Sequence, residues 1–184
     1  MTPARWRSAG FGLLALAGCQ LAGCQSEPEQ KLAAANGTTP PVASPAPSPV
    51  DGTHPVSGLP VVPLEIRAGG KVHRFTVEVA RSADEQAYGL MNRQQLAPGE
   101  GMVFPFAPPR PASFWMKSTL IPLDMIFVRA DGTIARIASA QPLSLDPIGV
   151  GEPVLAVLEI AGGRAAELGI TADARVSWPG GPQR

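Results

Sequence analysis

Residues 61–79 read VVPLEIRAGGKVHRFTVEV, and this stretch sets the expected fold class. In its second half Phe75, Val77 and Val79 alternate with polar residues, which is the pattern of a strand with one buried face. A Gly-Gly pair in its middle is typical of a hairpin turn. We therefore predict a β-hairpin made of strands Val61–Arg67 and Lys71–Val79.

The rest of the chain predicts more short strands and little helix. A capping box from Ser82 to Glu85 indicates a short helix that reaches about Met91, and Arg164–Leu168 is expected to form one helical turn. A polar loop is expected at Gln141–Pro153. Further strands are expected at Gly101–Phe106, Ala112–Lys117, Leu123–Arg129, Thr133–Ser139, Val154–Ile160 and Arg175–Trp178. Short strands at regular spacing favour a mainly β (α+β) domain, a compact barrel- or sandwich-like fold with one short N-terminal helix and one helical turn near the C-terminus.

The N-terminus has the pattern of an export signal. Met1–Arg7 carries two arginines, and the apolar run Ser8–Ala17 that follows is too short to span a bilayer. Two overlapping lipoprotein cleavage motifs then end at Cys19 and Cys24. We expect a signal peptide of residues 1–23, or 1–18 if Cys19 is the lipidated residue. An ordinary secretory signal with incidental cysteines is the alternative.

Lipidation at either cysteine predicts an exported protein whose main partner is a membrane, because acyl chains hold a protein to a bilayer. Glutamine follows both cysteines, whereas lipoproteins with aspartate there tend to stay in the inner membrane. The expected location is therefore the outer membrane, with the domain facing the periplasm. These are the only two cysteines, so no disulfide is expected in the domain.

The mature chain is expected to have three parts. Residues 24–60 form a disordered tether rich in Pro, Ala and Ser, residues 61–178 a single globular domain, and residues 179–184 a tail. The chain has 15 Lys+Arg and 15 Asp+Glu, and loss of Arg5 and Arg7 with the signal leaves 13 against 15. This balance gives no reason to expect nucleic acid as a partner.

A resemblance to a known family rests on several blocks. The block FWMKSTLIPLDMIF (114–127) is the most specific, and GLMNR (89–93), GMVF (101–104), VLEIAGG (157–163) and LGI (168–170) accompany it. Together they resemble the domain-of-unknown-function 192 family over about Val61–Trp178. Ser118 departs from the pattern, since family members often have asparagine there. The resemblance implies a compact, mainly β, often exported domain, and it implies no reaction.

Polar residues inside these apolar blocks are the candidate site residues. Asp124 lies in an apolar run, where a carboxylate is either paired for structure or used in a pocket with Lys117 or Arg93. Arg93 either complements a helix C-terminus or binds an anionic group. Glu159 lies on a solvated face or on a pocket face of its strand. The expected ligand groove comprises Arg93, Trp115, Lys117, Thr119, Asp124 and Glu159.

Three functions are compatible with these residues. The first is a non-enzymatic module that binds a small ligand or an envelope protein, without a cofactor. The second is a hydrolase that uses Asp124 with Glu159 or Lys117. The third is a Cu(I)-binding protein, since thioethers suit Cu(I); the same methionines are otherwise expected to fill an irregular core. Its candidate ligands are Met91, Met102, Met116 and Met125, with Trp115 and His73 nearby. Zinc is not expected, because His54 and His73 are the only histidines.

Overall fold

The computed structural model describes residues 52–182. The predicted signal peptide, both candidate lipidation cysteines, the tether up to residue 51 and the last two residues of the tail lie outside the described residues. The elements within the described range, in chain order, are β1 (Gly52–Thr53), β2 (Pro60–Ala68), β3 (Lys71–Val79), α1 (Ala83–Tyr88), β4 (Glu100–Phe114), β5 (Leu123–Val128), β6 (Ile134–Ala140), β7 (Ile148–Ala161), α2 (Arg164–Glu167) and β8 (Arg175–Ser177).

The eight strands form one sheet in the order β1-β2-β3-β4-β7-β5-β6, with β8 paired to β2. The β3–β4 pair is parallel and is connected through α1, whereas the other pairs are antiparallel. This confirms the mainly β fold, the β2–β3 hairpin, the short N-terminal helix and the helical turn near the C-terminus. Neither helix in residues 52–182 is long and apolar enough to cross a membrane.

The sheet curls until its far ends meet. Strand β8 pairs with β2 on one side, and an isolated bridge joins Arg175 to Thr133, just before β6. The Val176 N–H also donates to the Gly132 carbonyl oxygen at 2.9 Å. The curled sheet therefore encloses a first hydrophobic core, to which β2, β3 and β8 contribute Leu64, Phe75 and Val176.

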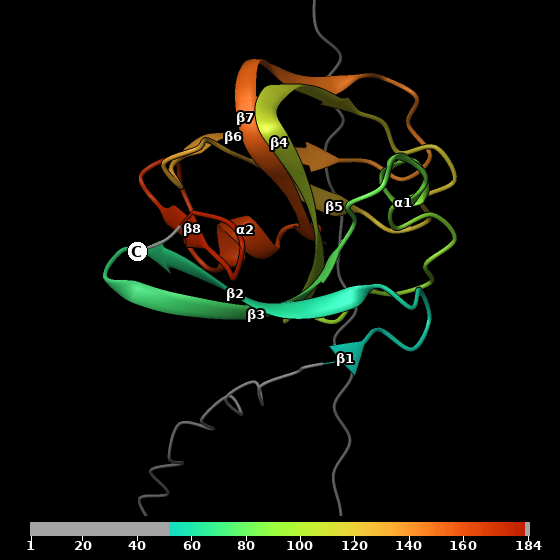
Figure 1. Cartoon of the computed structure of the whole chain (residues 1–184), viewed down its shortest axis with the longest axis horizontal. Coiled ribbons are helices and arrows are strands. Elements are labelled where there is room, and N and C mark those ends of the chain that lie inside the picture. Colours follow the sequence, from blue (N-terminus) through green and yellow to red (C-terminus); the bar gives the residue numbers. More distant parts are fainter. Residues whose placement is uncertain (1–51, 183–184) are drawn as a thin grey trace, which may run out of the picture. The chain divides into compact units, whose positions relative to one another are not determined.

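A second core lies on the other face of the three central strands. Alternate residues of β4, β5 and β7 point to opposite faces, so that Val103, Ile126 and Leu158 enter the first core. Their neighbours enter the second core, with Met102, Phe104, Met125, Phe127 and Val157 among them. In Figure 1, α1 lies on one side of the long β4–β7 pair, and α2 and β8 lie on the other. The central strands are therefore buried on both faces.

The β4–β7 pair is longer than expected. Two separate strands were expected at 101–106 and 112–117, but β4 runs unbroken from Glu100 to Phe114. Proline lacks an N–H donor but is compatible with extended backbone, so the prolines shift the pairing register without ending the strand. These shifts lie between Pro105 and Arg110 and between Pro111 and Ser113. The far end of β4 pairs with residues 148–149, which places the start of β7 inside the loop expected at 141–153.

The folded part also begins earlier than expected. Residues 52–60 were assigned to the disordered tether, but β1 pairs with β2 through Gly52–Val61 and Thr53–Pro60. The turn after β1 is fixed to β3, because the Ser57 hydroxyl donates to the Glu78 carboxylate and His54 Nδ1 lies 3.7 Å from it. The folded domain therefore begins at about residue 52 instead of residue 61.

Candidate ligand-binding pocket

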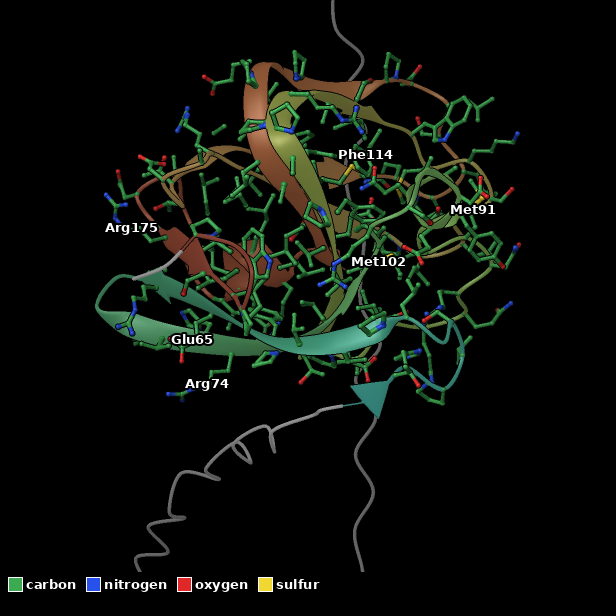
Figure 2. All side chains as sticks on the ribbon, viewed as in Figure 1. Glu65, Arg74, Met91, Met102, Phe114 and Arg175 are labelled. Carbon is green, nitrogen blue, oxygen red and sulfur yellow. The ribbon has the colours of Figure 1, made fainter. Side chains whose placement is uncertain are left out.

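A pocket of about 350 Å³ opens over the second core, between α1 and the end of β4. Helix α1 and the turn after it form one wall, and residues 110–115 form the opposite wall. Phe104, Thr119 and Glu159 complete the lining. The full lining is Ala83, Gln86, Ala87, Tyr88, Gly89, Leu90, Met91, Phe104, Arg110, Ala112, Ser113, Phe114, Trp115, Thr119 and Glu159. In Figure 2, Met91 and Phe114 lie on the α1 side of the β4–β7 pair, away from Arg175.

Local sequence fixes the α1 wall. The Ser82 hydroxyl accepts from the Glu85 N–H, and the Glu85 carboxylate accepts from the Ser82 N–H, which confirms the predicted capping box. The Gln86 amide then donates to the carbonyl oxygens of Ala80 and Pro105 at 3.2 and 3.1 Å. At the end of the helix Gly89 has φ +50, and a Cβ there would lie 3.3 Å from the Phe104 ring. Glycine therefore lets the helix end rest directly on the pocket floor.

Glu159 is the buried acidic residue in the lining of this pocket, at its floor. Its neighbours across the ladder are Met102 of β4 and Met125 of β5, and directly opposite residues share a face of the sheet. Only 4% of Glu159 is exposed, and burial raises the pKa of its carboxyl group to about 8. Among the hydrogen bonds and ion pairs of residues 52–182, none involves this carboxyl group. A buried polar group without a partner is costly, so a water or a bound molecule in the pocket has to satisfy it.

Aromatic rings surround the pocket. Tyr88 and Trp115 stand at its mouth and are 57% and 53% exposed, respectively. Phe104 and Phe114 pack edge to face deeper in, with ring centroids 5.0 Å apart. Lys117 places its Nζ 5.5 Å from the Trp115 ring centroid. An aromatic mouth above a single buried carboxyl group is an arrangement typical of a ligand site.

The loops beside the pocket mouth carry backbone strain. Asn92, Ser118 and Leu143 are the non-glycine residues in the described range with positive φ, at 61°, 56° and 62°. The three loops bond to one another, since the Asn92 N–H donates to the Ser118 carbonyl oxygen and the Leu143 N–H to that of Thr119. Such conformations are costly for most side chains but tolerated by asparagine. Ser118 therefore has a φ that asparagine would adopt at lower cost than serine.

Only half of the six residues of the expected ligand groove line the pocket. Trp115, Thr119 and Glu159 line the pocket, whereas Arg93, Lys117 and Asp124 do not. Lys117 is exposed and lies against the Trp115 ring. The pocket residues that the sequence did not indicate include Tyr88, Gln86, Phe114 and Arg110. The position of Tyr88 at the end of the predicted helix could have pointed to it, but nothing in the sequence showed that α1 and Glu159 of β7 line the same pocket.

Asp124 has a structural setting on the opposite face of the sheet. It pairs with Ile160, one step away from the Met125–Glu159 pair, so its side chain points away from Glu159. It is 1% exposed. Its two oxygens accept hydrogen bonds from the Ser139 hydroxyl and from the Ala165 N–H, both at 2.9 Å. Asp124 therefore ties β6 and α2 to β5, which corrects its expected place in a groove with Arg93 and Lys117.

Arg93 lies outside the pocket and forms an ion pair with Glu78. Its guanidinium donates to both oxygens of Glu78, at 2.8 and 2.7 Å, and both side chains are largely buried. Helix α1 ends at Tyr88, so Arg93 is too far along the chain to complement the helix C-terminus. Its role is to neutralise Glu78, the carboxylate that also holds His54 and Ser57.

The methionines gather in the second core. Met102 and Met125 flank Glu159, Met116 lies in the same core, and Met91 lines the pocket. Figure 2 labels Met91 and Met102. Within the described range, no group of three or more His, Cys, Asp or Glu residues is arranged to hold a metal ion. The Cu(I) hypothesis depends on thioethers and stays a prediction.

Fold and pocket together define a mainly β domain with a pocket on the outer face of its curled sheet. Residues 64–178 match the DUF192 family, described as Uncharacterized ACR. The match covers more than half of the 184 residues, so this chain belongs to the DUF192 family, as its sequence blocks predicted. No curated protein matches the chain.

Two solved structures are similar to this chain. A protein of unknown function from Novosphingobium aromaticivorans DSM 12444 is 47% identical, with a TM-score of 0.68 over 72% of this chain and 94% of that one. A protein from Sinorhizobium meliloti 1021, proposed to be a transcription regulator, is 38% identical, with a TM-score of 0.64 over 65% of this chain and 95% of that one. The similarity covers nearly all of both solved chains.

Proposed function

We propose that this protein is a binding module that takes a small molecule into the pocket beneath α1, with Glu159 as its polar anchor. The observation that carries the proposal is the buried carboxyl group of Glu159, which lines the pocket without a protein partner. Satisfying this group with a ligand removes a desolvation cost that the free protein bears. The aromatic residues at the mouth supply apolar contact area.

Binding is better supported than hydrolysis. A hydrolase of the expected kind needs two titratable groups that reach one substrate atom. Asp124 and Glu159 lie on opposite faces of the sheet, and Lys117 lies outside the pocket lining. The other ionisable residues in the lining are Tyr88 and Arg110. Glu159 therefore acts as a single polar contact, which suits recognition more than acid–base chemistry by a pair.

We further propose that this module is held in the cell envelope by a lipid on Cys19 or Cys24. The two cleavage motifs support the anchor, and the equal numbers of basic and acidic residues, 15 each, give no support for a nucleic-acid partner. Metabolic labelling with an alkyne fatty acid should tag the full chain. We expect Cys19→Ala or Cys24→Ala to abolish the label, and equal labelling of both single variants and the double variant would exclude a lipid anchor.

A ligand screen tests the pocket directly. We expect compounds that bind the full chain to perturb the indole N–H resonance of Trp115. Measured by thermal shift for both proteins, Trp115→Ala should weaken their binding by about tenfold or more, since truncating an aromatic hot spot costs about 2 kcal/mol or more. Glu152→Gln is the control, because Glu152 is 43% exposed and lies outside the pocket lining. A screen whose hits bind Trp115→Ala and wild type equally would contradict the proposed site.

A further inference from the structure

The lining of the pocket points to the charge of its ligand. The chain has ten aromatic residues, three Trp, one Tyr and six Phe, and four of them line this one pocket. They are Tyr88, Phe104, Phe114 and Trp115. The face of an aromatic ring carries a negative potential that attracts cations. Two thioethers, from Met102 and Met125, flank the carboxyl group at the floor, and sulfur is a soft, polarizable contact.

Resting on the proposed function, we propose that the ligand is an organic ammonium ion, whose charged head lies against the Glu159 carboxylate and within reach of the aromatic rings. Glu159 is more than nine-tenths buried and has no partner among the described residues. An ammonium group supplies the opposite charge that this carboxylate lacks. A neutral ligand can hydrogen-bond to the carboxyl group, but it brings no charge to offset the ionised form and gains nothing from the ring potential.

The other charged groups near the site do not oppose this assignment. Arg110 is the cation in the pocket lining, but it is exposed, stacks 4.2 Å from the Phe106 ring centroid and donates to the Gln86 amide oxygen. Its charge therefore stays at the mouth, where water and salt screen it. Lys117 is exposed outside the lining. Tyr88 on α1 is the other titratable group in the lining, and Asp124 on β5 faces the opposite core.

Ammonium binding is expected to release a proton, which gives the proposal a distinctive pH dependence. Burial holds the pKa of Glu159 at about 8 in the empty pocket. The ammonium ion binds the ionised form, so affinity should rise as pH rises and level off above pH 8. Between pH 6.5 and pH 9 the ionised fraction grows about 30-fold, and the affinity should grow by the same factor. A neutral hydrogen-bond acceptor would show the opposite trend.

The test compares choline with 3,3-dimethyl-1-butanol, a neutral molecule of the same shape, at millimolar concentration on the full chain. Binding is followed through the Trp115 indole resonance at pH 6.5, 7.5 and 9. We expect choline to bind with rising affinity, the neutral molecule to bind at least tenfold more weakly at pH 9, and Glu159→Gln to remove both the preference and its pH dependence.

Any of four outcomes would overturn the ammonium assignment. Equal binding of the two probes, or affinity that falls with pH, would show a neutral ligand and leave the proposed binding function intact. No response to either probe would also reject the ammonium ion, and the ligand screen would then decide the proposed function separately. If Glu159→Gln lost affinity for both probes alike, the residue would be shown to shape the pocket without selecting charge.

Discussion

Replacing Glu159 with glutamine is expected to stabilise the protein in alkaline solution, by as much as about 5 kcal/mol at pH 9. The pKa of Glu159 is raised from 4.5 to about 8 by burial. Each pKa unit corresponds to about 1.36 kcal/mol, so this value is an order-of-magnitude upper limit for full ionisation. Glutamine is neutral at every pH and similar in shape, so it does not bear this cost.

The pH dependence follows from the direction of the pKa shift. Below pH 4.5 the carboxyl group is protonated in both the folded and the unfolded state. Between pH 4.5 and pH 8 it ionises in the unfolded state but stays protonated in the folded state, so the free energy of unfolding falls as pH rises. Above pH 8 both states are ionised and the loss is constant. The variant should therefore match wild type near pH 4 and exceed it increasingly towards pH 8.

Urea unfolding of the full chain at pH 4, 6, 8 and 9 measures this difference. Glu152→Gln is a suitable control, because Glu152 is 43% exposed in its ion pair with Arg129, and its replacement should leave the pH profile close to that of wild type. A stability difference between Glu159→Gln and wild type that is constant over this range would mean that Glu159 ionises in the folded protein as it does in water. The expected gain in stability comes with the expected loss of ligand binding, a trade-off common at functional sites.

Arg93→Met is expected to destabilise the fold by about 3–5 kcal/mol, because it leaves a buried carboxylate without its cation. Glu78 is 3% exposed and receives two hydrogen bonds from the Arg93 guanidinium. Methionine replaces the apolar stem of arginine but not its charge. Thermal or urea unfolding of the full chain measures the loss.

Two comparisons separate the charge from the packing. The double variant Glu78→Gln with Arg93→Met leaves no buried charge, so it should recover at least half of the loss. Arg129→Met breaks a half-exposed arginine–glutamate pair and should cost no more than about 1 kcal/mol. If Arg93→Met cost no more than Arg129→Met, the Glu78–Arg93 pair would be shown to have little importance for stability.

Local patterns predicted the fold better than they predicted the site. The Gly69-Gly70 hairpin and the Ser82–Glu85 capping box depend on neighbours in the sequence, and both are present in the structure. The length of β4 was not predicted, because its prolines suggested a break between two shorter strands. Its extension depends on contact with β7, which lies some fifty residues further along the chain and leaves no local signal.

The roles of Asp124 and Glu159 show why the site was harder to predict. Both are single carboxylates in apolar strands, and β5 and β7 are buried on both faces, so alternation does not reveal which face holds a pocket. That distinction depends on which helix covers each face. The Ala165 N–H at the start of α2 meets Asp124, whereas α1 leaves open space above Glu159.

The way the chain enters the domain has a mechanical consequence. A pull from the N-terminal side reaches the domain at Gly52 and loads the β1–β2 ladder, which has only two residue pairs and opens one pair at a time. The contacts of His54 and Ser57 with Glu78 would yield next. Residues 52–59 would then peel away and add roughly 25–30 Å of reach, while the sheet and the pocket stay folded. Residues 52–59 would therefore extend only when the pulling force exceeds the strength of the contacts that His54 and Ser57 make with Glu78.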